Sequence, residues 1–395
     1  MTMITGVHTR KGIPFWRDER VLNAAAQVVS AVIVIGLVYW MVVNFMEITR
    51  QRGMSLSYQF LKEPAGFPIA ESSIPYDPTM SFGRAFAVGL INTLRVSVLG
   101  ILFATLLGFL VGLARLSSNW LFSRIALAFI EFHRNIPLLV LLFLWYFAFF
   151  SRLPPVKASL TLPGPIFINQ RGLYLAWPRL TETGNIFMIS IGIGILLASS
   201  AWIVLRRIRE TTGKSTSFGA VSLGLLILAP TIGWFAAGGT PLWVDIPILQ
   251  GFNFKGGLRL TPEFAAMLLG LSLYTAAFIA EVVRSGIQAV QRGQVDAAKA
   301  IGLSNYQVLN LIVIPQAMRV IIPPLISQYL NLTKNSSLAL AIGFQELFAV
   351  GKITINQAGR AVPVFIMVMA TYLAMSLFTS LVLNIYNRRI QFIER

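Results

Sequence analysis

The chain of 395 residues is 56% hydrophobic and 12% charged, with a mean hydropathy of +0.72 and a formal net charge of +17. So large a share of apolar side chains cannot be covered by a polar surface, which excludes a soluble protein and favours a membrane protein. The absence of cysteine excludes disulfides and thiol chemistry. The two histidines, His8 and His133, have no neighbouring ligand pattern, so no metal site is expected.

Apolar runs of about 20 residues predict membrane-spanning helices, because backbone polar groups in hydrocarbon must be hydrogen-bonded within their own element. We therefore expect an all-α integral membrane protein with about eight transmembrane helices. The first run is longer than the core of a cleavable signal and is expected to be retained. In chain order, the predicted spans are residues 21–46, 86–113, 125–150, 186–205, 218–237, 264–283, 321–344 and 362–385.

Lysine and arginine gather in alternate loops. If the N-terminus is cytoplasmic, the cytoplasmic segments hold more than half of the 32 Lys and Arg residues. Because short cytoplasmic loops collect positive charge, both termini are predicted to face the cytoplasm. This segregation accounts for the net charge, so no nucleic-acid partner is expected.

The long connecting segments suggest how the chain is organised. Residues 1–84 are predicted to form a cytoplasmic N-terminus, the first span and an outside loop rich in Pro, Ser and Gly, and residues 85–395 to form the core. Prolines, Tyr and Trp between the third and fourth spans predict short structure at the membrane interface. The fourth and fifth spans form an inserted hairpin, about residues 186–237, whose loop contains Gly-Lys-Ser-Thr. A phosphate-binding loop would need a glycine where Ile208 stands and a strand before it, so no nucleotide site is expected.

The segment at 284–319, between the sixth and seventh spans, has the pattern of helix, sharp turn and helix. The helix formers QVDAAKAI precede Gly302, which suits the left-handed conformation that ends a helix. Ser304 and Gln307 have the spacing of a capping box. The second helix is expected to stop at Pro315, which cannot continue the backbone hydrogen bonds.

Alanines at 297, 298 and 300 leave the first of these helices with a flat surface. Such a surface suits either docking against another protein or packing on the rest of this chain. The pattern D-A-A-x-x-x-G, then nine residues, then I-x-x-P resembles the EAA loop of ABC-importer permeases, with aspartate where that family usually has glutamate. The matching residues are Asp296, Ala297, Ala298, Gly302, Ile312 and Pro315.

The surrounding sequence is similar to the polar amino-acid (histidine/glutamine-type) branch of these permeases. The similarity is carried by TPEFAAMLLGLSLYTAAFIAEVVRSGIQAVQRGQ, QAMRVIIPPLISQYLNLTKNSSLALAIGFQEL and IEFHRNIPLLVLLFLWYF, and it extends from about residue 82 to the C-terminus, except for the hairpin. The layout most resembles the Q-type permease subunits of general L-amino acid transporters. It implies a type I ABC importer permease core of five helices, with an added N-terminal helix and the inserted hairpin.

This resemblance implies a permease subunit of a bacterial binding-protein-dependent ABC importer for L-amino acids, a multi-pass protein of the inner membrane that is not an enzyme. The implied partners are two copies of an ABC ATPase, a second homologous permease and a periplasmic amino-acid-binding protein, in membrane lipid. ATP and Mg would be bound by the ATPases, and no cofactor by this chain. The EAA loop docks on the ATPase in that family, which implies coupling roles for Asp296, Ala297, Ala298, Gly302 and Pro315.

Polar residues inside the spans are functional candidates, because placing them in lipid is costly. Glu131 and Arg134 lie roughly 12 Å into the third span, beside Pro137, which should kink the helix. They could hold the ammonium and carboxylate of an amino acid, or satisfy each other as an i, i+3 pair. Near the cytoplasmic end of the sixth span, a pair between Glu281 and Arg284 is expected to be structural.

Two further polar clusters lie on the second and seventh spans. They could meet substrate, although helix packing explains those on the second span equally well. The full set of candidates for the substrate pathway is Glu131, Arg134, Asn92, Thr93, Lys334, Asn335 and Ser336.

Two other functions are alternatives. An ion-coupled secondary amino-acid transporter should show inverted repeats and a carboxylate at mid-depth; no repeat is visible, and Glu131 is the only candidate carboxylate. A channel or assembly scaffold without transport predicts that uptake survives replacement of Arg134.

Overall fold

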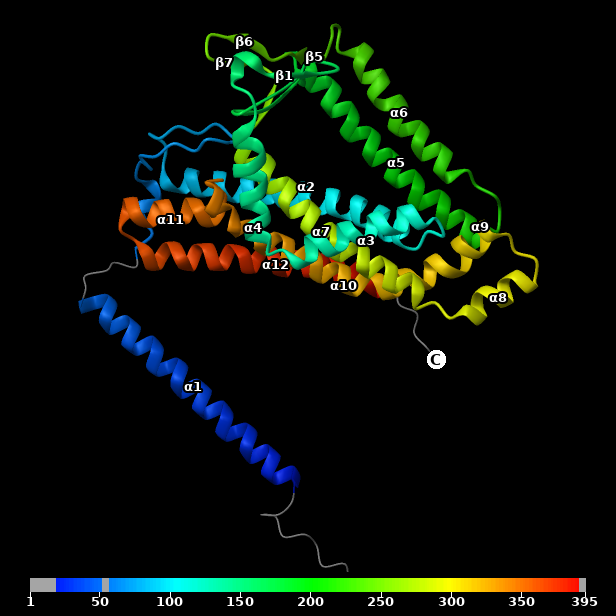
Figure 1. The fold of residues 1–395 in the computed structure, drawn as a ribbon, viewed down its shortest axis with the longest axis horizontal. Coiled ribbons are helices and arrows are strands. Elements are labelled where there is room, and N and C mark those ends of the chain that lie inside the picture. Colours follow the sequence, from blue (N-terminus) through cyan, green and yellow to red (C-terminus); the bar gives the residue numbers. More distant parts are fainter. Residues whose placement is uncertain (1–18, 52–56, 391–395) are drawn as a thin grey trace, which may run out of the picture.

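The computed structural model describes residues 19–51 and 57–390 (Figure 1). Within these residues, seven helices are long and apolar enough to cross a membrane, or eight if the bent pair Trp120–Asn135 and Leu138–Arg152 is counted as one span. The predicted membrane protein with about eight transmembrane helices is confirmed. The described side chains of α1 are exposed, and this helix stands apart from the others (Figure 1).

The elements have the following bounds. The α-helices are α1 (Glu19–Gln51), α2 (Phe82–Arg115), α3 (Trp120–Asn135), α4 (Leu138–Phe143), α5 (Gly184–Thr212), α6 (Phe218–Ala236), α7 (Pro262–Gln288), α8 (Arg292–Ala300), α9 (Asn305–Val308), α10 (Ile314–Asn335), α11 (Leu347–Ala358) and α12 (Ala361–Ile390). The short helices are η2 (Gln59–Lys62), η4 (Phe150–Arg152), η5 (Val156–Ala158) and η7 (Ser336–Ile342), with π-helical η3 (Leu144–Phe149) and η6 (Leu309–Val313). The strands are β1 (Leu160–Leu162), β2 (Ile166–Asn169), β3 (Gly172–Leu175), β4 (Trp177–Leu180), β5 (Leu242–Asp245), β6 (Ile248–Gln250), β7 (Asn253–Lys255) and β8 (Leu258–Leu260).

Helices α2 and α7 form the centre of the core and share a larger contact than any other pair of elements. One face of α2 carries a small residue at every fourth position: Gly100, Ala104, Gly108 and Gly112. A Cβ added at Gly108 would lie 2.6 Å from the Cβ of Ile279, and one at Gly112 would lie 2.8 Å from the carbonyl oxygen of Ala280. The missing side chains therefore let the two backbones approach closely, which is how membrane helices associate without a hydrophobic driving force.

Pro137 divides the third predicted span into two helices that meet at 105°. Helix α3 ends at Asn135, and Ile136 has φ −102° and ψ 129°. This is the extended conformation that a following proline favours. The predicted kink at Pro137 is confirmed, and it takes the form of a complete break, because the chain leaves the helical conformation at Ile136.

The prediction that a helix stops at Pro315 is wrong. A continuous helical segment runs from Asn305 to Ile342. It passes through the π-helical η6, and Pro315 lies in the first turn of α10. Proline is tolerated in the first turn of an α-helix, because the N–H groups of that turn have no hydrogen-bond partner within the helix. The change from the π-helix η6 to the α-helix α10 directly before Pro315 provides such a first turn.

Short strands lie on both sides of the inserted hairpin, where the sequence predicted only short structure at the interface. One antiparallel sheet has the order β1-β2-β3-β8, so segments before and after the hairpin pair with each other. Strands β4 and β5 pair at the base of the hairpin. We call residues 160–180 and 242–260 together the β-cap. Helices α5 and α6 pack chiefly on each other, so the hairpin is a side unit joined to the core through the β-cap.

Candidate functional site

The segment that joins α7 to α10 folds as a bent elbow, which we define as residues 292–313. Gly302 ends α8 with a φ of +87°, the predicted left-handed conformation. The predicted capping box is present: the backbone N–H of Gln307 donates to Ser304 Oγ at 3.3 Å, and the backbone N–H of Ser304 donates to Gln307 Oε1 at 2.9 Å. The elbow is therefore fixed by local sequence, as predicted.

The elbow has a small apolar core and an uncovered apolar surface. Ala298 is buried against Val308 and Val313, whereas Asp296 and Ala297 are exposed. The side chains of Ile301 and Tyr306, on either side of the turn, are 78% and 76% exposed. Two large apolar side chains at one bend, outside the packed core, form a surface suited to a protein partner.

The elbow is continuous with two helices that line a polar pocket. The pocket has a volume of about 280 Å³ and lies between α7 and α10. Tyr274, Thr275 and Phe278 of α7 line one side, and Gln328, Asn331 and Asn335 of α10 line the other. Amide groups at a helix interface within predicted spans can hold a polar solute, since each offers both donors and acceptors.

One residue of the broken span, Arg134, lies next to a residue of this pocket. The Arg134 guanidinium is 5.5 Å from the ring centre of Phe278, which lines the pocket. No ion pair joins Arg134 to Glu131 among the described residues; Glu131 instead accepts a hydrogen bond of 2.9 Å from Asn135. Both charged side chains are exposed on the chain. The proposed internal i, i+3 pair is therefore absent, and both charges are accessible to a ligand or a partner.

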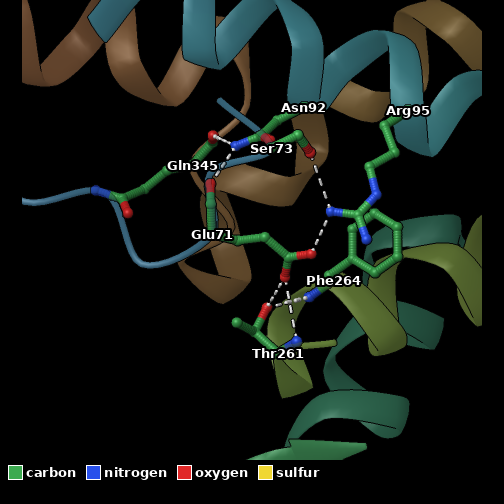
Figure 2. Close-up of polar contacts among 7 residues, drawn as sticks. All are labelled: Glu71, Ser73, Asn92, Arg95, Thr261, Phe264 and Gln345. Atoms are coloured by element: carbon green, nitrogen blue, oxygen red, sulfur yellow. Dashed lines mark hydrogen bonds and ion pairs between the residues drawn. The ribbon is translucent and has the colours of Figure 1, made fainter. Parts of the chain in front are cut away.

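The other candidates for the substrate pathway divide into two groups. Lys334 is exposed, one residue before Asn335 of the pocket. Asn92 and Thr93 are buried, and Asn92 Nδ2 donates to the carbonyl oxygens of Glu71 at 2.8 Å and Gln345 at 2.9 Å (Figure 2). Buried Ser336 donates to the carbonyl oxygen of Thr333. The structure thus gives the asparagine and the serine partners within the chain.

Glu346 was missed by the sequence reasoning and is fully buried. It caps α11, since its carboxylate accepts hydrogen bonds from the backbone N–H groups of Phe348 at 2.9 Å and Ala349 at 2.8 Å. The Tyr372 hydroxyl donates a third bond of 2.7 Å from α12. A buried carboxylate needs such partners, so Glu346 fixes α11 against α12.

Glu71 was also missed and joins elements that are distant in sequence. Its carboxylate forms an ion pair of 2.7 Å with Arg95 and accepts hydrogen bonds from the Thr261 N–H at 3.1 Å and hydroxyl at 2.7 Å (Figure 2). The loop before α2 is thereby tied to α2 and to the start of α7. At the other end of α7, the predicted pair between Glu281 and Arg284 is confirmed, and Arg284 also donates to Gln288 at 2.6 Å.

A membrane bundle with a broken span, a polar pocket between two spans and a bent elbow with an apolar surface has the parts of a transport subunit. The chain belongs to the family of binding-protein-dependent transport system inner membrane components, whose model matches residues 100–392. It is therefore a permease of that family, as its resemblance implied.

Curated relatives match over nearly the whole chain. The putative amino-acid ABC transporter permease protein YhdX of Escherichia coli K12 is 43% identical over 388 residues, which cover 98% of each chain. The general L-amino acid transport system permease protein AapQ of Rhizobium johnstonii is 41% identical over 96% of this chain and 94% of its own. BztB of Rhodobacter capsulatus, a glutamate/glutamine/aspartate/asparagine transport system permease protein, is 36% identical over 96% of each chain. These matches confirm the resemblance to amino-acid ABC permeases.

Proposed function

We propose that this chain is the permease subunit of an ABC importer that takes up L-amino acids across the bacterial inner membrane. Full-length similarity to amino-acid permeases supports the substrate class. The observation that carries the mechanism is the elbow, with Ile301 and Tyr306 uncovered on either side of its turn. An ion-coupled transporter would have no need of such a surface.

The elbow connects a partner's movement to the pocket. Helix α7 ends at Gln288, four residues before α8 begins, and α9 runs without a break through η6 into α10. Because α7 and α10 form the two walls of the pocket, a force on the elbow moves both walls. Asp296, Ala297, Ala298 and Gly302 lie in the elbow, and Pro315 lies directly after it in the first turn of α10; we assign coupling roles to all five. In the proposed complex, two ABC ATPases that bind ATP and Mg act on the elbows of this chain and of a second homologous permease.

The pocket between α7 and α10 is the proposed passage for the amino acid. Asn331 and Asn335 supply amide groups, Arg134 beside Phe278 supplies a cation for the carboxylate, and Glu131 supplies an acceptor for the ammonium. A periplasmic binding protein delivers the substrate from the side opposite the elbow. We infer that both termini are cytoplasmic, which the positive-inside distribution supports.

Replacement of one exposed aromatic residue tests the coupling. In membranes that contain the complete complex, Tyr306→Ala should weaken co-purification of the ATPase and lower amino-acid uptake about tenfold or more, since an anchor at an interface is worth at least about 2 kcal/mol. Phe252→Ala is the matched control, because Tyr306 and Phe252 are both 76% exposed and Phe252 lies in the β-cap. Equal effects of the two substitutions would contradict the proposal.

The ion-coupled alternative is tested in the same membranes. Uptake by the proposed importer requires ATP and persists when an ionophore collapses the ion gradients. Uptake that stops with the gradients and continues without ATP would establish the alternative instead. Competition with a panel of amino acids then defines the substrate range.

A further inference from the structure

A second, larger pocket lies at the end of the core opposite the elbow. Its volume is about 770 Å³, and it is bounded by residues 70–73, α2, β4, β8 and the start of α7. It is separate from the polar pocket between α7 and α10 and has a different character. One end is charged and the other is lined by large apolar side chains.

The charged end presents one unbalanced positive charge. The lining includes three charged residues, Glu71, Arg95 and Arg259. Glu71 is 8% exposed, and its two carboxylate oxygens are engaged by Arg95 and Thr261 (Figure 2). Arg95 lies with its guanidinium 4.5 Å from the ring centre of Phe264 (Figure 2), which fixes its plane. Since Glu71 balances only one of the two arginines, the lining suits a ligand with a single negative charge.

The apolar end runs along two neighbouring helices toward the middle of the spans. On α2, Leu99 and Phe103 follow Arg95 at intervals of four residues, and on α7, Leu268 follows Phe264 at the same interval. These residues share one helix face with the charged group above them. Phe103 is 47% exposed, so this end of the pocket opens to the outside of the chain.

The length of the uncharged segment of α2 indicates where the charged end of the pocket lies relative to the membrane. The segment between Arg95 and Arg115 contains no charged residue. Twenty residues of α-helix rise about 30 Å, which equals the thickness of the hydrocarbon layer. The candidate span has 34 residues and is longer than the hydrocarbon layer, so placing its charge-free stretch in the hydrocarbon puts Arg95 at one boundary and Phe103 about 12 Å inside it. Trp177, 47% exposed beside the pocket, is a residue type that concentrates at this boundary.

We propose that this pocket binds one anionic phospholipid. The phosphodiester lies between Arg95 and Arg259, and an acyl chain follows the groove past Leu99 and Phe103. A water-soluble anion would match the charge but leave the apolar groove empty, and a neutral lipid would leave the positive charge unbalanced. The bound lipid connects the loop before α2, the β-cap and α7, so it stabilises the joint through which the side unit is attached.

The test uses the full chain purified in detergent and measures binding of phosphatidylglycerol, phosphatidylcholine and glycerol 3-phosphate by native mass spectrometry and by thermal shift. Phosphatidylglycerol should bind about tenfold more tightly than phosphatidylcholine, and glycerol 3-phosphate should not bind measurably. Arg259→Gln should weaken phosphatidylglycerol binding about tenfold, and so should Phe103→Ser. Arg171→Gln is the matched control, because Arg171 is exposed in the turn between β2 and β3 and does not line the pocket. Its carbonyl oxygen accepts from Arg259, which the substitution leaves in place, and its side chain donates to the carbonyl oxygen of Phe252 at 3.2 Å.

Each alternative has a distinct outcome. Equal binding of the two lipids would overturn the proposal, because the arginines would then select nothing. Equal weakening by Arg259→Gln and Arg171→Gln would show attraction by overall charge instead of a site. Binding of glycerol 3-phosphate as tight as that of the lipid would show a soluble-anion site. Phe103→Ser lies outside the β-cap and keeps the test decisive if Arg259→Gln disrupts the sheet.

Discussion

Replacement of Gly302 by valine tests whether the bend of the elbow matters for transport. Gly302 has a φ of +87°, and a Cβ added there would meet no atom within 4 Å. The cost is therefore conformational and not steric. A left-handed conformation costs an L-residue about 1–2 kcal/mol, and a change of that size alters an equilibrium about 5–30-fold. We expect uptake by the assembled complex to fall by this factor, with insertion and folding of the permease unchanged.

The assay is amino-acid uptake and ATP hydrolysis in proteoliposomes that hold the complete complex. Gly293→Val is the matched control, because Gly293 lies in α8, has no atom within 4 Å of an added Cβ and does not need a positive φ. Gly302→Asn should fall between the parent and Gly302→Val, since asparagine tolerates the left-handed conformation. Parental uptake by Gly302→Val would refute the reasoning, and so would an equal loss in Gly293→Val.

Two further predictions concern packing. Gly108→Leu should lower the free energy of unfolding by about 1–3 kcal/mol or more, because the new side chain would collide with Ile279. Thermal unfolding in detergent measures this, and Gly192→Leu, at an open position of α5, should shift it little. Glu346→Ala should cost the cap of α11 about 1–2 kcal/mol and leave the Tyr372 hydroxyl without its acceptor. Faster hydrogen exchange in α11 is the expected signature, and unchanged exchange would contradict the assigned cap.

The spans and the elbow were predictable because their signals are local. Apolar run length determines a span regardless of its neighbours, and a glycine followed by a capping box determines the turn. The position of the break at Pro137 was equally local, since proline restricts the residue before it. The angle of 105° between the two helices was not predictable, because after a break the direction of the next helix depends on the residues it packs against.

The β-cap and the buried carboxylates were not predictable from local pattern. Strands of three or four residues are too short to show a period. Their sheet also depends on pairing across the hairpin, as between Leu173 and Leu260. Glu71 stands in a polar, proline-rich loop, where a carboxylate is ordinarily solvated. Glu71 is buried where it contacts Thr261, which is 190 residues away in the sequence. The sequence around Glu71 has no pattern that predicts this contact.

The side unit lies between α2 and α7 in the sequence, so these two neighbouring helices are synthesised at different times. The glycine face of α2 is complete once Arg115 has been made, but α7 begins only at Pro262. At about 5–20 residues per second, a ribosome needs roughly 7–30 s to make the chain between them. During that interval α7 does not yet cover the glycine face of α2, which is exposed to lipid, to the insertion machinery or to another helix. The order of biosynthesis, as well as the final packing, is thus set by where the insertion lies.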